Sequence, residues 1–257
     1  MGLGDDLMAT GHIRGLQARD PRKVRIEYGK PLWSEVFDNN PRIARPGEVG
    51  DFQVYRPRGR NGLRPYISAK SVQRWTWQDY EPPVGELYFT ERELDFARKV
   101  GPLGIVLEPL LKSKASPNKN WGEARWAELV KLLREAQVEP SQLVPQSIMA
   151  MPRVRAVVTP TFRLAAAVLA NARAAVLHEG GMHHAAAVVG TPAVVIYGGY
   201  ISPRQTGYNL HTNLFTGGEP CGRRLPCGHC ARAMAEITPK QVFEEAMRLW
   251  ASTTART

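Results

Sequence analysis

The sequence lacks several features that would assign a class directly. No run of about 18 apolar residues occurs in its 257 residues, which excludes a membrane-spanning helix. Its three cysteines all lie within residues 221–230, and an odd, clustered set argues against a secreted disulfide framework. There is no G-x-G-x-x-G or Walker sequence and no internal repeat. The first six residues lack the basic and apolar regions of a signal peptide, so we expect a cytoplasmic protein.

Positive charge is in excess. The 34 Lys and Arg exceed the 24 Asp and Glu, for a net charge of +10. Residues 42–74 alone hold eight basic and two acidic side chains. Such a surface favours anionic partners, among them phosphates, acidic lipids and nucleic acid, without choosing between them. The composition, 43% apolar and 23% charged, is typical of a globular protein and excludes disorder, collagen and a coiled coil.

Hydrophobic periodicity predicts an α/β protein. We expect helices at residues 7–16, 91–100, 162–172, 182–189 and 239–251, and one with Asn120 as its N-cap. We expect strands at residues 24–28, 52–55, 103–107, 154–158, 174–177 and 193–197. Short apolar strands that alternate with helices are typical of βαβ units on a parallel sheet.

The N-terminal third has a different character. Residues 56–80 are rich in Arg, Pro, Gly and aromatic side chains without a clear period, and we expect loops there. The composition changes near residue 98. This change predicts an N-terminal domain, residues 1–98, and a C-terminal domain, residues 99–257.

The strongest local feature is the segment from His178 to His184, HEGGMHH, where a predicted strand ends and a helix begins. Ligands bind at this position in open α/β sheets. Gly180 and Gly181 let the backbone approach a ligand, and the free N–H groups of the helix favour an anion such as a diphosphate. A tight turn without a ligand is an equal alternative. His178 and His183 are five residues apart, unlike the H-E-x-x-H motif, so a zinc protease is not expected.

Two further segments carry charged candidates. Lys119, between the strand at 103–107 and the next helix, is either a point charge for a phosphate or a solvated loop lysine. Asp5 follows the glycine turn Gly2-Leu3-Gly4 and is either a general base or a helix cap.

The cysteines form the pattern Cys221-x5-Cys227-x2-Cys230, with His229 beside the last one. Cysteine and histidine at this density bind zinc or iron in other proteins. Only one C-x2-C pair is present and a fourth donor is not assured. A reduced, ordered loop is therefore favoured, and no metal site is assigned.

Taken in order, these segments resemble glycosyltransferase family 9, the ADP-heptose:lipopolysaccharide heptosyltransferases. The family's opening glycine turn and aspartate correspond to residues 1–5, and its K-x-W motif to residues 119–121. Its donor signature, approximately D-[ST]-G-x-x-H-x-A-A-A-x-G-x-P, corresponds to residues 178–192, and its cysteine-bearing tail to residues 220–242. The match covers most of the C-terminal part but only the start of the N-terminal part.

The resemblance implies an α/β protein of the GT-B type, with two Rossmann-like domains of which the N-terminal one is reduced. It implies inverting transfer of a heptose-like sugar from a nucleoside diphosphate, with an ADP-sugar favoured and no obligatory metal or other cofactor. The acceptor would be an anionic saccharide such as lipopolysaccharide core. Such an enzyme works in the cytoplasm, where peripheral association with the inner face of the membrane stays open.

The resemblance also implies roles for individual residues. Asp5 would be the general base on an acceptor hydroxyl. The donor would be bound by Lys119, Trp121, His178, Glu179, Gly180, Gly181, Met182 and His183. The acceptor would face the basic residues Arg56, Arg58, Arg60 and Arg64.

Some features depart from the family pattern. His178 and Glu179 stand where the family has Asp and Ser or Thr, and the glycine turn begins at Met1 without a preceding strand. Two alternatives therefore stay open. One is a transferase that modifies nucleic acid or protein, since a basic aromatic face also suits single strands. The other is a homologue that binds a sugar nucleotide without turnover.

Overall fold

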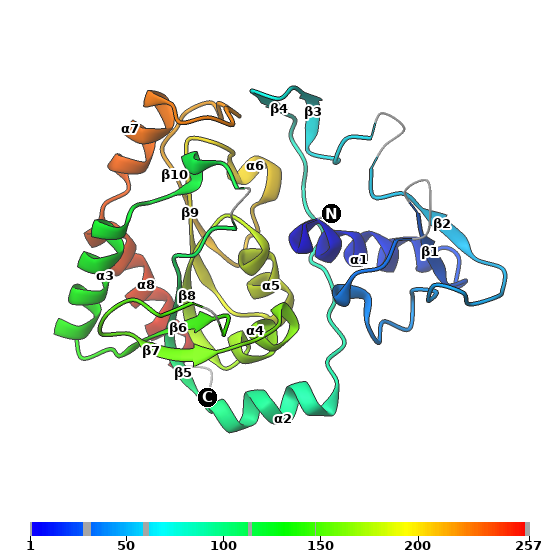
Figure 1. Cartoon of the computed structure of the whole chain (residues 1–257), viewed down its shortest axis with the longest axis horizontal. Coiled ribbons are helices and arrows are strands. Elements are labelled where there is room, and N and C mark those ends of the chain that lie inside the picture. The colour runs from blue at the N-terminus through cyan, green and yellow to red at the C-terminus, as the bar shows by residue number, and fades with distance from the viewer. Residues whose placement is uncertain (1, 28–31, 59–61, 113–114, 147, 255–257) are drawn as a thin grey trace.

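A six-stranded parallel sheet forms the centre of the computed structural model, which describes residues 2–27, 32–58, 62–112, 115–146 and 148–254 (Figure 1). Its strands are β5 (Leu103–Glu108), β6 (Pro140–Val144), β7 (Arg155–Val158), β8 (Ala172–His178), β9 (Ala193–Gly198) and β10 (Thr212–Phe215). Their spatial order is β7-β6-β5-β8-β9-β10. This is the 3-2-1-4-5-6 order of a doubly wound sheet, in which ligands bind where the order reverses. The reversal lies between β5 and β8.

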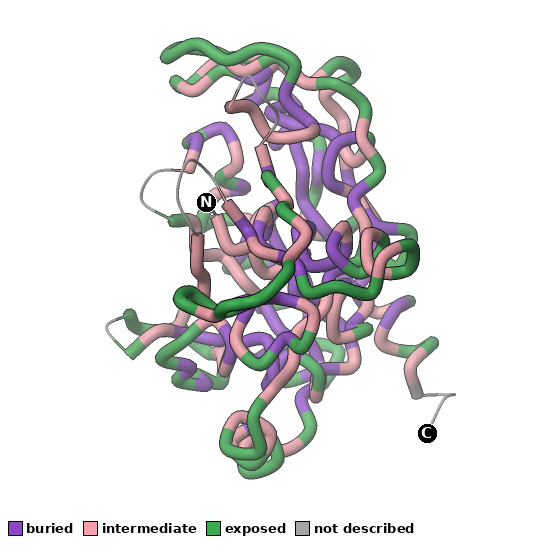
Figure 2. Tube along the Cα trace, turned by 90° about the vertical axis from the view of Figure 1, so that its right-hand side faces the viewer, coloured by how far each residue is buried: buried purple, intermediate pink, exposed green. Residues whose placement is uncertain are grey.

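Helices cover both faces of the sheet (Figure 1). On one face lie α3 (Glu123–Glu135) and α8 (Pro239–Thr254); on the other lie α4 (Phe162–Leu169) and α5 (Gly181–Val189). Successive strand residues alternate between the two cores: Val176 packs with the α3 and α8 side, and Leu177 with the α4 and α5 side. Buried chain accordingly concentrates in the interior, with exposed segments at the periphery (Figure 2).

Shorter elements complete the C-terminal part. These are the 3-10 turn η2 (Pro117–Lys119) and the helices α6 (Pro203–Thr206) and α7 (Gly228–Glu236). Helix α2 (Glu91–Val100) leads into β5 and packs against α4 through the buried side chain of Arg163, which pairs with Glu93 at 2.7 Å.

The N-terminal part is built around helix α1 (Leu3–Gln17), which lies beside α5 (Figure 1). Within the described residues its strands form only a parallel pair and a hairpin. The pair is β1 (Val24–Ile26) and β2 (Gln53–Tyr55), with the 3-10 turn η1 (Glu35–Phe37) between them, and the hairpin is β3 (Ile67–Lys70) and β4 (Trp75–Trp77). Helix α1 approaches α5 closely because residue 4 is glycine: a Cβ there would overlap the imidazole of His184.

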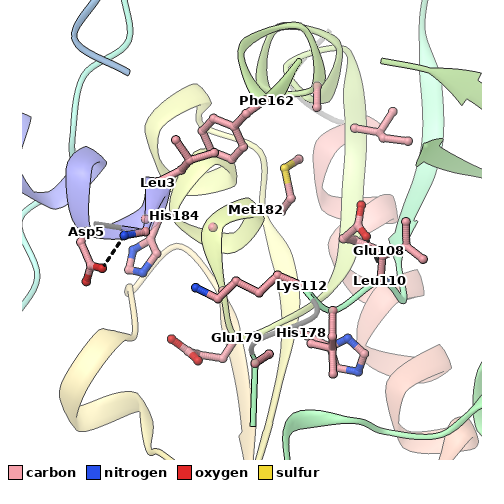
Figure 3. Close-up of a pocket in the computed structure, with 18 of the residues that line it drawn as sticks. Leu3, Asp5, Glu108, Leu110, Lys112, Phe162, His178, Glu179, Met182 and His184 are labelled. Carbon is pink, nitrogen blue, oxygen red and sulfur yellow. Dashed lines mark hydrogen bonds between the residues drawn. The ribbon is translucent and has the colours of Figure 1, made fainter. Parts of the chain in front are cut away.

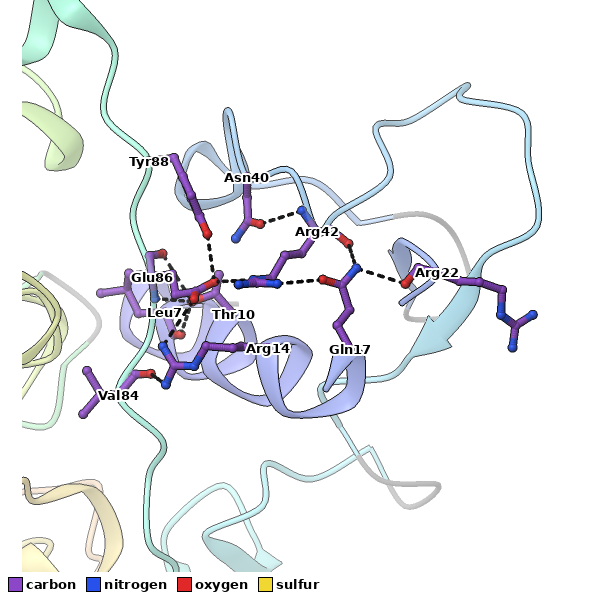
Figure 4. A network of polar contacts seen from close by, with 10 residues as sticks. All are labelled: Leu7, Thr10, Arg14, Gln17, Arg22, Asn40, Arg42, Val84, Glu86 and Tyr88. Atoms are coloured by element: carbon purple, nitrogen blue, oxygen red, sulfur yellow. Dashed lines mark hydrogen bonds and ion pairs between the residues drawn. The ribbon is translucent and has the colours of Figure 1, made fainter. Parts of the chain in front are cut away.

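A polar network holds α1 in place (Figure 4). An extended segment around Glu86 crosses the helix, and the Glu86 N–H donates to Thr10 Oγ1 at 2.7 Å. The Glu86 carboxylate also pairs with Arg14 at 3.3 Å and with Arg42 at 3.1 Å. Because these groups come from separate segments, the network fixes where the first turn of α1 lies.

Gly85, in this extended segment, lies directly against the backbone of α1. A Cβ on Gly85 would overlap the carbonyl oxygen of Leu7, so Gly85→Ala is expected to lower the free energy of unfolding by about 1–3 kcal/mol. Gly15→Ala, in α1 and with no atom within 4 Å of its Cβ, is expected to raise the free energy of unfolding by up to about 1 kcal/mol. Urea denaturation measures both, and equal effects of the two variants would contradict this packing.

The structure confirms the parallel sheet and most predicted elements after residue 90, and it corrects others. Asn120 is not an N-cap, because its side chain accepts the N–H of Gly122 at 3.0 Å and α3 begins only at Glu123. Residues 56–80 are not all loop, since the hairpin β3–β4 lies there. Its strands of three and four residues are too short to produce a readable period. The boundary near residue 98 stays a prediction, and α2 spans it.

Candidate functional site

A cavity of ≈ 570 Å³ lies at the reversal point of the sheet (Figure 3). Glu108 at the end of β5 and His178 at the end of β8 line its sheet side, and Asp5 of α1 lines the opposite side. The cavity therefore lies between the N-terminal helix and the carboxyl ends of the central strands. This is the location at which doubly wound proteins bind their ligands.

The N-termini of three helices meet at this cavity. Gly4, Phe162 and Gly181, from the first turns of α1, α4 and α5, all line it. A Cβ placed on Gly181 would lie 3.4 Å from the Phe162 ring and 3.9 Å from the backbone nitrogen of Gly4. The N-caps of α1 and α5, Gly2 and Gly180, have no side chain to cap the first N–H groups. Three positive helix ends around one space favour an anion.

Three cationic side chains line the same space among the described residues: Arg64, Lys112 and Lys119. The side chain of Lys112 extends between Glu179 and the wall that carries Glu108 (Figure 3). Burial, followed by the nearby charges of Lys119 and Arg64, lowers the pKa of Lys112. Because these cations repel one another, a bound anion would reduce the electrostatic repulsion between them.

Glu179 pairs with Lys119 across the floor of the cavity. Its other carboxylate oxygen accepts the Thr206 hydroxyl at 3.2 Å. Burial, the largest single influence, would raise the pKa of Glu179, but the neighbouring Lys119, His183 and Thr206 together outweigh it and the pKa lies below its ordinary value. Glu179 is therefore ionised and holds the Lys119 ammonium group at the edge of the anion-favouring space.

Asp5 faces the cavity from α1. One carboxylate oxygen accepts the Tyr66 hydroxyl at 2.6 Å, and the other pairs with Arg64 at 3.0 Å and accepts the Gly2 N–H at 3.1 Å. A carboxylate has about four acceptor positions, so one remains for a further hydroxyl group. Its contacts thus orient Asp5 and leave one acceptor position available to a substrate.

Glu108 is a buried carboxyl group that the sequence did not single out. Its side chain accepts the Leu110 N–H at 3.1 Å. Burial raises the pKa of Glu108 to about 8, so it is mainly protonated at neutral pH. A protonated carboxyl group offers the cavity both a donor and an acceptor.

This raised pKa predicts a pH dependence of stability. The unfolded chain loses the Glu108 proton near its ordinary pKa of 4.5, whereas the folded protein keeps it to about pH 8. The stability that Glu108 contributes is therefore fully present below about pH 4.5 and is lost as the pH rises to about 8. We expect the unfolding free energy of the wild type to fall relative to Glu108→Gln by up to about 1.4 kcal/mol per pH unit in this window.

Urea unfolding between pH 5 and pH 8 measures this difference. Glu236→Gln, the same change at an exposed position, serves as the matched control and should follow the wild type. Parallel curves for wild type and Glu108→Gln would contradict the raised pKa.

The histidines of the HEGGMHH segment shape the turn. His178 Nε2 accepts the Trp121 N–H at 3.2 Å, and burial with the Lys119 charge lowers the pKa of His178 to about 3. His183 Nδ1 accepts the Gly180 N–H at 2.9 Å, and its Nε2 donates to the Thr206 carbonyl at 2.8 Å. Both rings are therefore neutral and hold the backbone in place.

The structure brings together most of the residues predicted for the site. The cavity is lined by Asp5, Arg64, Lys119, His178, Glu179, Gly180, Gly181 and Met182. Trp121 and His183 do not line it: the Trp121 ring is fully buried and donates to the Ile237 carbonyl at 2.8 Å. Tyr66, Glu108 and Lys112 line it although no motif marked them.

The residues predicted to bind the acceptor do not lie together at the cavity. The structure describes three of them, and of these three only Arg64 lines the cavity. Arg56 is exposed and pairs with Glu27 at 3.5 Å, and Arg58 lies at the end of the same described segment. Arg60 lies outside the described residues.

Fold and cavity together define a class: a doubly wound α/β protein with a cavity at the reversal point that three helix N-termini and three cationic side chains line. Solved structures of similar fold are glycosyltransferases of the GT-B type. The fold predicted from the sequence, GT-B with a reduced N-terminal part, is confirmed. No protein-family model and no curated protein matches the chain.

Three solved structures illustrate the similarity. A family 9 glycosyltransferase from Veillonella parvula is 14% identical with a TM-score of 0.64, over 98% of this chain and 95% of that one. TibC from enterotoxigenic E. coli, an iron-containing dodecameric glycosyltransferase, is 14% identical with a TM-score of 0.64, over 98% and 74%. The E. coli ADP-heptose lipopolysaccharide heptosyltransferase II is 19% identical with a TM-score of 0.50, over 68% and 56%. This chain thus spans little more than half of the last protein.

No helix in the described part of the chain combines the length and apolar composition that a membrane span needs.

Proposed function

We propose that the protein is a glycosyltransferase that moves a sugar from a nucleoside diphosphate to a saccharide hydroxyl. The observation that carries this proposal is the cavity at the sheet reversal, where three helix N-termini and the cations Arg64, Lys112 and Lys119 surround one space that Asp5 also lines. A diphosphate with a sugar attached has the charge and size for such a cavity. The similar proteins named above, among them an ADP-heptose transferase, support an ADP-sugar as donor.

In the proposed reaction the acceptor hydroxyl attacks the anomeric carbon of the sugar and its proton passes to Asp5. The bond between that carbon and the diphosphate oxygen breaks on the opposite side, so the configuration inverts. Lys119, Lys112 and the N–H groups of Gly181 and Met182 stabilise the charge of the departing diphosphate. These groups can carry the leaving-group charge without a divalent cation in the transfer step.

Arg64 has two roles in this proposal. It pairs with Asp5 at 3.0 Å and lines the cavity together with Tyr66, just before the hairpin β3–β4. A guanidinium group at this place suits an anionic saccharide, because it binds phosphate or carboxylate with two hydrogen bonds. The acceptor would therefore enter along the N-terminal part.

A transfer assay tests the proposal. ADP-, UDP-, GDP- and CDP-sugars are each incubated with the full chain and with lipopolysaccharide core oligosaccharide, and the released nucleoside diphosphate is measured together with the mass of the product. We expect one donor to give a glycosylated oligosaccharide of inverted configuration. If a donor binds but no saccharide, protein or nucleic acid acceptor is modified, the chain is a binding protein and the proposal is wrong.

A further inference from the structure

Arg163 is a buried cation in the first turn of α4 that does not line the cavity at the sheet reversal. The residue is only 4% exposed. A positive side chain in a first turn opposes the helix dipole, so the stability of α4 itself does not explain its place there. Arginine keeps its charge when it is buried, and each of its five N–H groups then needs an acceptor. The acceptors therefore show which segments the side chain holds.

The side-chain hydrogen bonds of Arg163 within the described residues all go to the N-terminal part. Nε and Nη2 donate to the two carboxylate oxygens of Glu93 at 2.7 Å and 2.8 Å. Nη2 also donates to the Tyr88 carbonyl at 2.6 Å, and Nη1 donates to the carbonyls of Glu35 and Asp38 at 3.1 Å and 3.4 Å. These five hydrogen bonds equal the number of N–H groups in a guanidinium group. The side chain thus fastens α4 to two separate stretches of the N-terminal part.

Glu93 is oriented for this contact by its own helix. It is the third residue of α2, and its carboxylate accepts the N–H and the hydroxyl group of the N-cap Thr90 at 2.7 Å and 3.0 Å. Burial, the largest single influence, would raise the pKa of Glu93, but Arg163 and Thr90 together outweigh it and the pKa lies below its ordinary value. The pair is therefore ionised at neutral pH, and its two parallel hydrogen bonds fix the direction as well as the distance between α2 and α4.

The first of the two stretches reaches α1, the helix that carries Asp5. The turn η1, which supplies the Glu35 carbonyl, packs against α1. Its fully buried Val36 and Phe37 belong to the same apolar core as Leu7 of α1. Because Leu7 is two residues from Asp5, the turn connects the guanidinium group to the part of the helix that carries the proposed base.

The second stretch reaches α1 through the polar network around Glu86 (Figure 4). The Tyr88 hydroxyl donates to the Glu86 carboxylate at 3.4 Å, and the Glu86 N–H donates to Thr10 Oγ1 of α1 at 2.7 Å. Arg163 holds this segment at the Tyr88 carbonyl. The segment that crosses α1 is therefore fixed to α4 as well as to α1.

On its other side, α4 forms part of the wall of the cavity. Its N-cap Thr161 and its residues Phe162 and Ala165 line the cavity. Helix α1 also packs directly on α5 at Gly4, but a packing contact is non-directional, whereas hydrogen bonds fix distance and angle. Arg163 thus supplies the directional link between the wall of the cavity and α1.

We propose that Arg163 is a positioning residue for the transfer, which sets the place of Asp5 relative to the groups that bind the diphosphate. This inference rests on the proposed function. Arg163 takes no proton and contacts no substrate. A displacement of a reacting group by about 1 Å can lower a rate by about 100-fold. The diphosphate would still meet Lys119 and the N–H groups of α5, which do not depend on this link.

Hydrogen exchange followed by mass spectrometry tests the link without any substrate. Arg163→Lys keeps the charge but loses the planar fork and two of the five donors. We expect the amides of α1 and η1 to exchange at least about tenfold faster in this variant, while β8 and β9 keep their wild-type rates, because local opening is confined to segments that lose contacts. Arg173→Lys is the matched control: Arg173 donates to the Trp250 carbonyl at 2.9 Å within the C-terminal part, and its replacement should leave the exchange of α1 unchanged.

Kinetics of the same proteins test the positioning role. With the nucleotide-sugar and oligosaccharide that give product in the transfer assay, Arg163→Lys is expected to lower kcat by roughly 10- to 100-fold. Calorimetric titration should find the Kd of the nucleoside diphosphate within about threefold of the wild type. The double variant Arg163→Met/Glu93→Gln removes both charges and leaves no carboxylate uncompensated, and it should show the same split. Arg173→Lys should change neither quantity.

The proposal is overturned if α1 exchanges at the wild-type rate in Arg163→Lys, or if α1, β8 and β9 all exchange faster together, as they would for a merely structural residue. It is also overturned if kcat keeps its wild-type value, or if kcat and the affinity for the nucleoside diphosphate fall in parallel. A wild type that transfers no sugar contradicts the proposed function instead, and hydrogen exchange then still decides whether Arg163 holds α1.

Discussion

Asp5→Asn is expected to lower the rate of sugar transfer by roughly 10²- to 10⁴-fold, the usual contribution of a general base. Asparagine keeps the size and most hydrogen bonds of Asp5 but cannot take the proton of the acceptor hydroxyl. Because Asp5 is not among the groups proposed to bind the diphosphate, binding of the nucleoside diphosphate should stay within about threefold of the wild type. Transfer rates and calorimetric titration of the same preparations measure the two effects.

Asp6→Asn is the matched control for this variant. Asp6 is the next residue of α1 and is buried, but it does not line the cavity. The same chemical change there should leave transfer nearly unchanged. If Asp5→Asn and Asp6→Asn behaved alike, Asp5 would be a structural residue and not the base.

The second large effect is expected at Lys119. Lys119→Met removes a cation that faces the proposed diphosphate, and a hydrogen bond to a charged group contributes about 1.5–3 kcal/mol. We therefore expect binding of the nucleoside diphosphate to weaken by roughly 10- to 100-fold. Lys240→Met, at an exposed position of α8, is the control and should not change the affinity.

Lys119→Met is also expected to destabilise the fold, and this effect must be distinguished from the loss of affinity. It leaves the buried Glu179 carboxylate without its cation, and breaking a buried ion pair costs about 3–5 kcal/mol of stability. The double variant Lys119→Met/Glu179→Gln removes both charges and should recover much of that stability. If the double variant also recovered full affinity for the nucleoside diphosphate, Lys119 would not be a diphosphate ligand.

The doubly wound sheet was predictable because its central strands are short apolar runs between helices. Strand β6 was not, because Ser141 and Gln142 interrupt its apolar pattern although all five of its residues are buried. These buried polar groups form hydrogen bonds with distant parts of the chain. The Gln142 side chain, for example, accepts the Met151 N–H at 2.8 Å. The hairpin β3–β4 was missed for a different reason, since its strands are shorter than the window that reveals a period of two.

The strand-to-helix turn at Gly180 and Gly181 was predictable because glycines at such a junction have a local physical meaning, and its role in binding an anion stays a prediction. Glu108, Lys112 and Tyr66 carry no such local signal. They reach the cavity through topology, since β5 ends beside β8 and the chain before β3 folds back over α1. The acceptor prediction relied on charge density along the chain, which does not determine whether side chains such as Arg56 face the cavity.

Calorimetric titration of the wild-type chain with ADP, AMP and adenosine, and with the same series for uridine, guanosine and cytidine, shows whether the cavity at the sheet reversal binds a diphosphate. One nucleoside diphosphate is expected to bind with a stoichiometry of one, its monophosphate more weakly and its nucleoside most weakly. If all members of a series bound equally, or if no nucleoside diphosphate bound at millimolar concentration, the cavity would not be a diphosphate site and the proposed transfer would be contradicted.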